Sequence, residues 1–227
     1  MERLNEFIKK YRIEISPLSM RLCREGIERM KKSIDPAHDE KHVENILENI
    51  DGFLESKEVK VERINFEILL VAICWHDVWK STRMPDSIVS VLVNQIWDGW
   101  GSAKVYKREV KLGKEENKRL RKVFWIIGNH PRDMTVHMPF RTYLETKILK
   151  DADRLERWNL KRHVDFFEKL ALVRDVESQK WVRWLIKFFK KKYTLWSDSD
   201  KKYYFRWAKD EFRKRREMYI VELERQG

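Results

Sequence analysis

Apolar residues recur along much of the chain at three- and four-residue intervals, the spacing of helices that each bury one face. Two helix starts are marked by a capping residue followed by proline, at Ser16-Pro17 and at Asp35-Pro36. They predict helices over residues 17–32 and from 36 to about 54. We predict further helices over residues 2–11, 62–79, 88–97, 115–128, 141–158, 161–175, 178–193 and 198–224.

Segments containing glycine, proline and polar residues separate these helices. Residues 84–87, 98–102 and 129–133 are predicted to be loops, and residues 105–114 are too charged and too short to assign. The chain has 7 Gly and 5 Pro, too few for a protein built from hairpins and tight turns. We therefore predict an all-α fold. It has a helical core over residues 1–175 and a basic, aromatic helical extension over 176–227 that packs on the core.

Length and composition fit a globular protein. A chain of 227 residues suffices for one large domain, and 42% hydrophobic residues is ordinary for a folded core. No apolar run approaches the roughly 20 residues of a membrane span, and the N-terminus lacks the apolar core of a signal peptide. Cys23 and Cys74 match no disulfide or zinc framework. We expect reduced thiols, a cytoplasmic protein and no membrane partner.

The positive charge is concentrated near the C-terminus. The whole chain has a net charge of +12, and residues 176–227 carry 15 Lys+Arg against 8 Asp+Glu. A basic surface attracts phosphate-bearing partners and speeds their arrival. The charge therefore favours a nucleotide or nucleic acid as partner without selecting between them.

A histidine–aspartate pair, His76-Asp77, ends the most apolar stretch of the chain, residues 68–75. Burying an imidazole and a carboxylate is costly unless they are hydrogen-bonded, paired or bound to a cation. His42 and Asp153 lie in predicted helices before and after this pair. Two imidazoles and two carboxylates projecting from facing helices can coordinate one divalent ion. This mixed set suits Mn²⁺, Fe²⁺, Co²⁺, Ni²⁺ or Mg²⁺ better than a structural zinc ion.

The order of these motifs resembles the HD superfamily of metal-dependent phosphohydrolases. The chain carries His-Asp-x-x-His at 38–42 and Asp-Ala-Asp-Arg-Leu-Glu at 151–156, as small HD-domain hydrolases do, and the similarity spans about residues 33–171. The resemblance implies an HD-domain helical bundle with one metal ion, for which we expect Mn²⁺. The four metal ligands that it implies are His42, His76, Asp77 and Asp153.

The same resemblance implies an activity. Related HD-domain hydrolases resemble nucleotide pyrophosphohydrolases, so we expect nucleoside or deoxynucleoside triphosphates to be hydrolysed to monophosphate and pyrophosphate through a metal-activated water. One alternative is an HD-type phosphodiesterase or nuclease that acts on nucleic acid or on a cyclic nucleotide. Another is a metal-bearing nucleic-acid-binding protein without turnover. Base and sugar preference and the oligomeric state have no signature in the sequence.

Two residues are candidates for catalysis. Lys80 follows Asp77 by three positions, where many HD hydrolases have a lysine, and is expected to hold a substrate phosphate. His130 stands where the family commonly has a histidine and is expected to contact phosphate or protonate the leaving group. A helix-end lysine and a surface histidine are the ordinary alternatives. His137 could join His130 at a second metal, but the adjacent His-His of binuclear HD enzymes is missing, so we expect one metal.

Further polar residues are assigned from their positions near the motifs. His38, Asp39 and Asp151 are candidates to support the ligands through hydrogen bonds, or else are helix-start or surface residues. Arg132 and Arg154 are candidates to bind substrate phosphates through bidentate contacts. Arginine is also common on solvated helices, which is the alternative for both.

Aromatic and basic residues alternate between residues 181 and 216. Such a segment can stack on bases while its lysines neutralise phosphates, as in proteins that bind single strands. The helical spacing favours an amphipathic helix packed on the core instead, with the lysines in solvent. The apolar stripe of that helix is formed by Trp181, Trp184, Leu185, Phe188 and Phe189.

Overall fold

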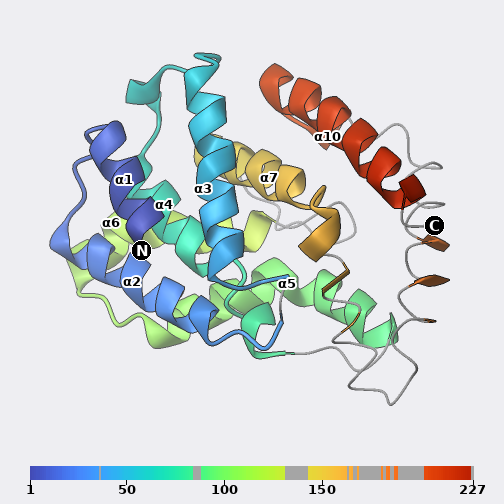
Figure 1. Ribbon diagram of the computed structural model, residues 1–227. Helices are drawn as coiled ribbons and strands as arrows, with labels where there is room; N and C mark the ends of the chain where they lie inside the picture. Colours follow the sequence, from blue (N-terminus) through green and yellow to red (C-terminus); the bar gives the residue numbers. More distant parts are fainter. Residues whose placement is uncertain are drawn as a thin grey trace.

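The computed structural model describes residues 1–35, 37–83, 88–130, 143–162, 164, 165, 168, 180, 183, 184, 187, 188 and 202–225. Within these residues the chain is helical and contains no strand, which confirms the predicted all-α class. Two short 3-10 helices, η1 (Val61–Arg63) and η2 (Lys80–Thr82), flank the central α-helix. The α-helices in Figure 1 are α1 (Glu2–Lys10), α2 (Pro17–Lys31), α3 (Glu40–Glu55), α4 (Phe66–Trp75), α5 (Ile88–Glu109), α6 (Lys114–Asn129), α7 (Leu144–Glu156) and α10 (Arg206–Arg225).

Helix α4 is the centre of the bundle. Its sequence is apolar apart from Glu67, and every residue from Ile68 to Trp75 is buried. A helix that is apolar all round needs neighbours on all sides, and α4 contacts α2, α3, α5, α6 and α7. Figure 1 shows α4 passing behind α3. The residues that follow Trp75 are therefore delivered into the interior of the protein.

Side-chain caps determine where two of the helices start. Ser16 accepts the backbone N–H of Ser19 at 3.2 Å, which confirms the predicted start of α2. The predicted helix over residues 62–79 is wrong at both ends, because α4 starts after its capping residue Asn65 and ends at Trp75. The histidine–aspartate pair consequently lies in the turn after α4 rather than inside a helix.

The third predicted helix begins later than expected. Asp39 accepts the N–H of His42 at 3.1 Å and caps α3, so that the helix starts at Glu40 and not at residue 36. Asp35 was the expected cap, but its carboxylate accepts the N–H of Ala37 at 2.8 Å within a turn. His38, which the predicted helix included, therefore precedes the helix.

The loop predicted over residues 98–102 does not exist. Helix α5 runs through this segment without interruption. Gly101 faces the ring of Trp79 so closely that an added Cβ would lie 2.5 Å from Trp79 Cγ. Ser102, the next residue, accepts the N–H of Trp79 at 3.2 Å. The glycine thus permits a close contact between a helix and a turn. In the sequence the same glycine resembles a loop residue, which explains the wrong prediction.

Helix α10 packs against α7. The ring of Trp158, which follows α7, lies 5.1 Å from the ring of Phe212 and 5.5 Å from that of Tyr219, measured between centroids. Tyr203 stacks on Phe212 at 5.0 Å. The predicted boundary at residue 175 and most of the predicted helices 161–175 and 178–193 lie outside the described residues. The division into core and extension stays a prediction.

Two aromatic residues of the expected C-terminal stripe are half-exposed. Trp184 and Phe188 retain 49% and 48% of their surface, and their rings stack on each other at 5.6 Å. At these two positions burial against the core, which we predicted, is not found. The other members, Trp181, Leu185 and Phe189, lie outside the described residues.

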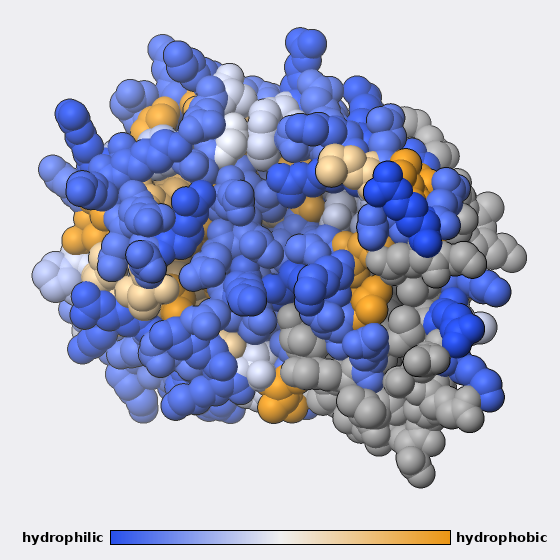
Figure 2. Space-filling model, in the orientation of Figure 1, coloured by the Kyte–Doolittle hydropathy of each residue, from blue (hydrophilic) through white to orange (hydrophobic). Residues whose placement is uncertain are grey.

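The surface in Figure 2 is mostly hydrophilic on the face shown, with small separate apolar patches. Among the helices that the structure describes, none combines the length and the apolar character that a membrane crossing requires. The apolar residues of the described chain instead gather in one large core around α4, with two small clusters between α7 and α10.

Candidate metal centre

The four predicted ligands come together from three parts of the chain. His42 lies in the first turn of α3, and Asp153 lies near the end of α7. His76 and Asp77 occupy the turn after α4. All four are buried, and one ligand atom from each lies within 4.8 Å of the others. A buried His/Asp cluster that could hold a metal ion is therefore present at the place where these helices meet.

The distances within this cluster match a shared ion. His42 Nε2 lies 3.0 Å from His76 Nε2, 3.1 Å from Asp77 Oδ2 and 3.5 Å from Asp153 Oδ1. His76 Nε2 lies 3.3 Å from the same Asp77 oxygen. Neighbouring ligands of an octahedral ion with bonds of about 2.1 Å are separated by about 3.0 Å. The four side chains thus already have the separation that coordination of one ion requires.

The outer nitrogen of His76 is hydrogen-bonded, and that of His42 has a carboxylate behind it. His76 Nδ1 lies 2.7 Å from the carbonyl oxygen of Ile73 and donates to it. His42 Nδ1 lies 3.3 Å from Glu156 Oε2. A carbonyl or carboxylate behind a histidine fixes the ring and its tautomer for metal binding. Both Nε2 atoms therefore face the centre of the cluster as acceptors when the rings are neutral.

Glu156 was not among the predicted site residues, although it closes the motif at residues 151–156. It lies three positions after Asp153 on α7, so it shares that residue's helix face. Asn45 donates to Glu156 Oε1 at 2.9 Å, and Arg162 Nε lies 2.9 Å from the same oxygen. The helical spacing could have identified this carboxylate. Its partner Arg162 had no signal in the sequence.

The electrostatics of the cluster favour a cation. Neither carboxylate oxygen of Asp77 accepts a hydrogen bond from any described residue, and the side chain is 1% exposed. A buried carboxylate that accepts no well-aligned hydrogen bond is stable only beside positive charge. Burial opposes its ionisation, but Lys80, His76 and His38 hold the pKa of Asp77 well below its usual range. The donor types and these unsatisfied oxygens fit a divalent ion.

His42 shows the same preference from the other side. Burial disfavours the charged imidazole, but the carboxylates of Glu156 and Asp77 outweigh it and raise the pKa of His42 to about 10. The ring is therefore protonated on both nitrogens, and positively charged, at neutral pH in the metal-free protein. A positive charge at the centre of the cluster is thus favoured whether a proton or a metal ion supplies it.

A second group of possible ligands adjoins the first and shares Asp77. It contains Asp98 from α5 and His130 from the end of α6, with ligand atoms of all three within 4.8 Å of one another. His130 Nε2 lies 3.6 Å from Asp77 Oδ1 and 4.0 Å from Asp98 Oδ2. Asp98 was missed because the segment around it was predicted to be a loop. A continuous α5 would have placed it on a buried face.

His130 lies beside the cluster, and its hydrogen bond fixes its tautomer. Its Nδ1 donates to the carbonyl oxygen of Ile127 at 2.6 Å, so Nε2 is an acceptor in the neutral ring. Burial lowers the pKa of His130. In this state the ring can accept a proton or bind a metal, whereas protonation of a leaving group, the expected role, requires that it first gain a proton.

Lys80 lies between the carboxylates of Asp77 and Asp98. Its Nζ is 3.3 Å from Asp77 Oδ1 and forms an ion pair with Asp98 Oδ2. His38 Nε2 lies 3.2 Å from the same Nζ, while His38 Nδ1 pairs with Asp35 at 2.7 Å. The lysine thus lies beside the cluster, and its contact with a substrate phosphate stays a prediction. It points inward rather than into open solvent.

The residues predicted to support the ligands divide into two sets. His38 and Asp39 lie beside the cluster, and Asp39 accepts a hydrogen bond from Arg162 at 2.9 Å. Asp151 instead faces α10, where it accepts the N–H groups of Tyr204 and Phe205, each at 2.9 Å. Burial raises the pKa of Asp151 to about 7.

Of the two arginines predicted to bind substrate, the structure describes Arg154 only. Arg154 is buried, and its guanidinium lies 6.0 Å from the centre of the Tyr203 ring, on the side of α7 that faces α10. A guanidinium over an aromatic face contributes to packing. Arg132 lies outside the described residues, as does His137.

Geometry and chemistry therefore give a buried cluster of four side chains that could hold a metal ion, with an adjoining group around Lys80. The type of metal is not determined by these donors alone. A comparison of the chain with known protein families, with curated proteins and with solved structures found no match.

Proposed function

We propose that this protein is a metal-dependent phosphohydrolase that uses one divalent ion, most simply Mn²⁺. The observation that carries the proposal is the convergence of four residues singled out from the sequence, His42, His76, Asp77 and Asp153, on one buried point. These four residues come from three separate segments of the chain. A chance arrangement would have to bring the segments together and also place the side chains at the distances of metal ligands. The resemblance to HD-type hydrolases supports the same interpretation.

The protein's own residues have distinct tasks in this scheme. The four ligands hold the ion, while Glu156 and the carbonyl of Ile73 keep the two imidazoles turned toward it. A divalent ion, when bound, acidifies a water molecule and polarises a phosphoryl oxygen. His130 presents an acceptor nitrogen next to Asp77 and is placed to take up a proton during the reaction. Burial excludes bulk water from these groups, which strengthens their interactions.

For the substrate we propose a nucleoside or deoxynucleoside triphosphate, hydrolysed to monophosphate and pyrophosphate. The support is the resemblance of the motifs at 38–42 and 151–156 and the net charge of +12, which favours a polyphosphate ligand. Cleavage at the α-phosphorus would release pyrophosphate as one unit. Lys80, whose Nζ lies 3.3 Å from Asp77 Oδ1, is the cation that we propose to contact the substrate phosphates.

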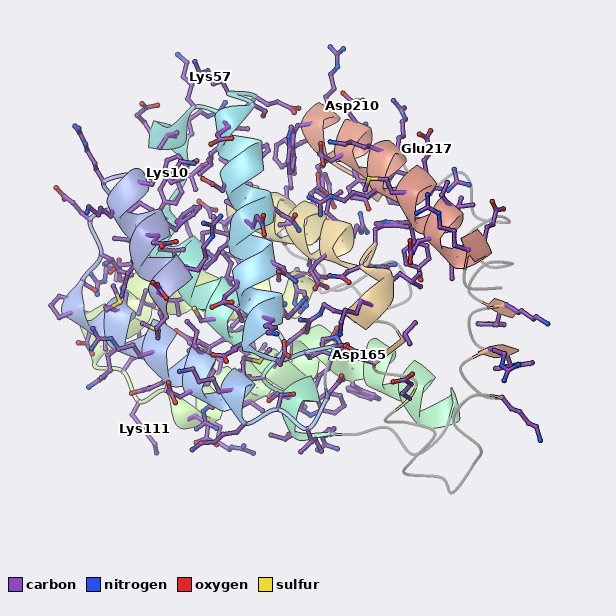
Figure 3. The ribbon with its side chains drawn as sticks, viewed as in Figure 1. Lys10, Lys57, Lys111, Asp165, Asp210 and Glu217 are labelled. Atoms are coloured by element: carbon purple, nitrogen blue, oxygen red, sulfur yellow. The ribbon has the colours of Figure 1, made fainter. Side chains whose placement is uncertain are left out.

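The test is product analysis with a panel of nucleoside and deoxynucleoside triphosphates in the presence of Mn²⁺. We expect the intact protein to release monophosphate and pyrophosphate in a 1:1 ratio, and Asp210→Asn to do the same. Asp77→Asn should release neither product. Asp210 is a matched control, because it lies at the surface near the start of α10, with its side chain 57% exposed (Figure 3). Release of orthophosphate, or equal turnover by Asp77→Asn, would contradict the proposal.

A second candidate is a phosphodiesterase or nuclease that uses the same centre. It is favoured by the stacked, half-exposed rings of Trp184 and Phe188, which lie beside the exposed side chains of Arg183 and Lys187. Such rings can stack on unpaired bases. Cleavage of a single-stranded oligonucleotide that is lost in Trp184→Ala/Phe188→Ala, with nucleotide hydrolysis absent, would select this function. Metal-dependent binding of the oligonucleotide without cleavage would indicate a binding protein.

A further inference from the structure

The two carboxylate oxygens of Asp77 face different sets of partners. Oδ2 lies 3.1 Å from His42 Nε2 and 3.3 Å from His76 Nε2, in the four-residue cluster. Oδ1 lies 3.3 Å from Lys80 Nζ and 3.6 Å from His130 Nε2, in the adjoining group. One side chain thus belongs to two neighbouring sites, one through each oxygen.

The adjoining group has the composition of a metal site of its own. Asp77, Asp98 and His130 offer two carboxylates and an imidazole, all buried, with ligand atoms within 4.8 Å of one another. Oδ1 of Asp98 is also buried and accepts no hydrogen bond from the described part of the chain. Carboxylate and imidazole ligands suit Mn²⁺. Two-metal sites hold their ions about 3.5–4 Å apart, a spacing that one carboxylate can bridge.

The ammonium of Lys80 already lies in this group. It pairs with both carboxylates, Asp77 and Asp98, and the side chain is only 16% exposed. The backbone holds it there, because the N–H of Lys80 donates to the carbonyl oxygen of Asp77 at 2.9 Å in the tight turn that precedes η2. A divalent ion that used the same two carboxylates would meet this ammonium at short range, where like charges repel strongly.

We propose that Asp77, Asp98 and His130 form a second cation position, which the protein fills with the ammonium of Lys80, so that only one metal ion binds. Removal of the lysine charge then opens this position to a second divalent ion, joined to the first through Asp77. The inference rests on the proposed function, since it takes the first ion to be bound by His42 and its partners. It explains why two adjacent ligand groups need not make a two-metal enzyme.

The experiment is a titration with Mn²⁺ of the intact protein, Lys80→Met and Lys80→Met/Asp98→Asn, counting bound ions from the electron paramagnetic resonance signal of free Mn²⁺. We expect one ion per chain in the intact protein, two in Lys80→Met, and one again in the double variant. Magnetic coupling between the two ions should appear in the spectrum of Lys80→Met only, as expected for ions that share a carboxylate.

Lys10→Met is the matched control. Lys10 also lies between two carboxylates, at 2.7 Å from both Asp51 and Glu55, but on the surface at the end of α1 (Figure 3) and without a histidine. We expect this variant to bind one ion. The control separates opening of a ligand group from the general effect of removing a positive charge.

Two results would overturn the inference: two ions on the intact protein, or a single ion on folded Lys80→Met. If Lys80→Met does not fold, Lys80→Gln provides the same comparison with a polar side chain, and the count on the intact protein decides independently of both. The absence of any bound ion on the intact protein contradicts the proposed function itself, an outcome distinct from the other two.

Discussion

Two buried aspartates, Asp77 and Asp151, show how differently this protein uses the same side chain. Asp151, on α7, accepts the N–H groups of Tyr204 and Phe205 and so fixes the chain just before α10. Asp77 accepts no hydrogen bond from the described residues and is surrounded by imidazoles and one ammonium. Both are buried, yet the partners of Asp151 are backbone N–H groups, and those of Asp77 are side chains that can carry positive charge.

The difference separates a structural carboxylate from one that needs a cation. Backbone donors satisfy Asp151 permanently, so that no ligand is required there. The neighbours of Asp77 include imidazoles, and a metal ion can take the place of an imidazole proton. The kind of partner, rather than burial, therefore identifies the candidate site. Each prediction below tests this distinction, beginning with the largest effect.

Substitution of Asp77 by asparagine should weaken Mn²⁺ binding by more than about 100-fold, because loss of a group that only supports a ligand already costs about 10–100-fold. The same substitution at Asp151 should change the affinity by less than about 2-fold, since its carboxylate faces Tyr204 and Phe205 and does not touch the ion. Isothermal titration of both variants measures the two affinities. Equal losses in the two variants would remove the distinction between the aspartates.

Substitution of Asp151 by alanine should lower the free energy of unfolding by roughly 1–3 kcal/mol, because the N–H groups of Tyr204 and Phe205 lose their acceptor in a buried place. Asp151→Asn keeps an acceptor oxygen and should cost less. Urea denaturation of the metal-free protein gives both values. Equal losses in the two variants, which both lack the charge, would show that charge, and not hydrogen bonding, matters at this junction.

Glu156→Gln should weaken Mn²⁺ binding by about tenfold, because the carboxylate behind His42 orients that ring without touching the ion. The amide can still contact Asn45 and Arg162, so the fold should persist. The affinity is measured by the same titration as for Asp77→Asn, with circular dichroism to follow the fold. An affinity equal to that of the intact protein would mean that His42 is held by its own helix alone.

The smallest effect is expected at Asp51, a half-buried carboxylate at the contact of α1 and α3. Burial would raise its pKa, but hydrogen bonds from Lys10 and Tyr11 outweigh burial and lower the pKa of Asp51 below its ordinary value of 3.8. A lowered pKa in the folded protein stabilises it above about pH 4, and this contribution disappears as the pH falls through the folded pKa.

For this surface group the contribution should be less than about 1 kcal/mol. It is measured as the difference in unfolding free energy between the intact protein and Asp51→Asn, at pH 3 and at pH 6. The difference should be present at pH 6 and should shrink at pH 3. A constant difference would show that the hydrogen bonds, rather than the charge, stabilise this contact.

The helical class and the four residues of the cluster could be predicted from the sequence because their signals are local. Helix caps, apolar spacing and the pair that ends an apolar helix each occupy a few neighbouring residues. The boundaries at Asp39 and Trp75 were missed by a few positions. Two possible caps compete before α3, and Val78 and Trp79 in the turn after α4 continue its apolar pattern. These errors moved His38 and the histidine–aspartate pair out of helices but not out of the site.

The contribution of Asp98 could not be predicted, because it depends on a contact between distant segments. Gly99 and Gly101 resemble a chain break in the sequence, and only the approach of Trp79 shows why a glycine stands inside a helix. The direction of a side chain on α7 was equally inaccessible. Asp151 and Asp153 are two positions apart, and the position of α10 decides which of them is used for packing.

The distance in sequence between the ligands has a consequence for how the protein folds. His42 and Asp153 come from helices that are far apart in the sequence. Their segments meet through long-range contacts such as that from Asn49 to the carbonyl of Ala152, at 2.8 Å. Such contacts form only after a large part of the chain has been closed into a loop. No partly folded chain that lacks α7 contains the complete centre. A bound ion would therefore slow the unfolding of the finished protein, and it would do little to hasten the early steps of folding.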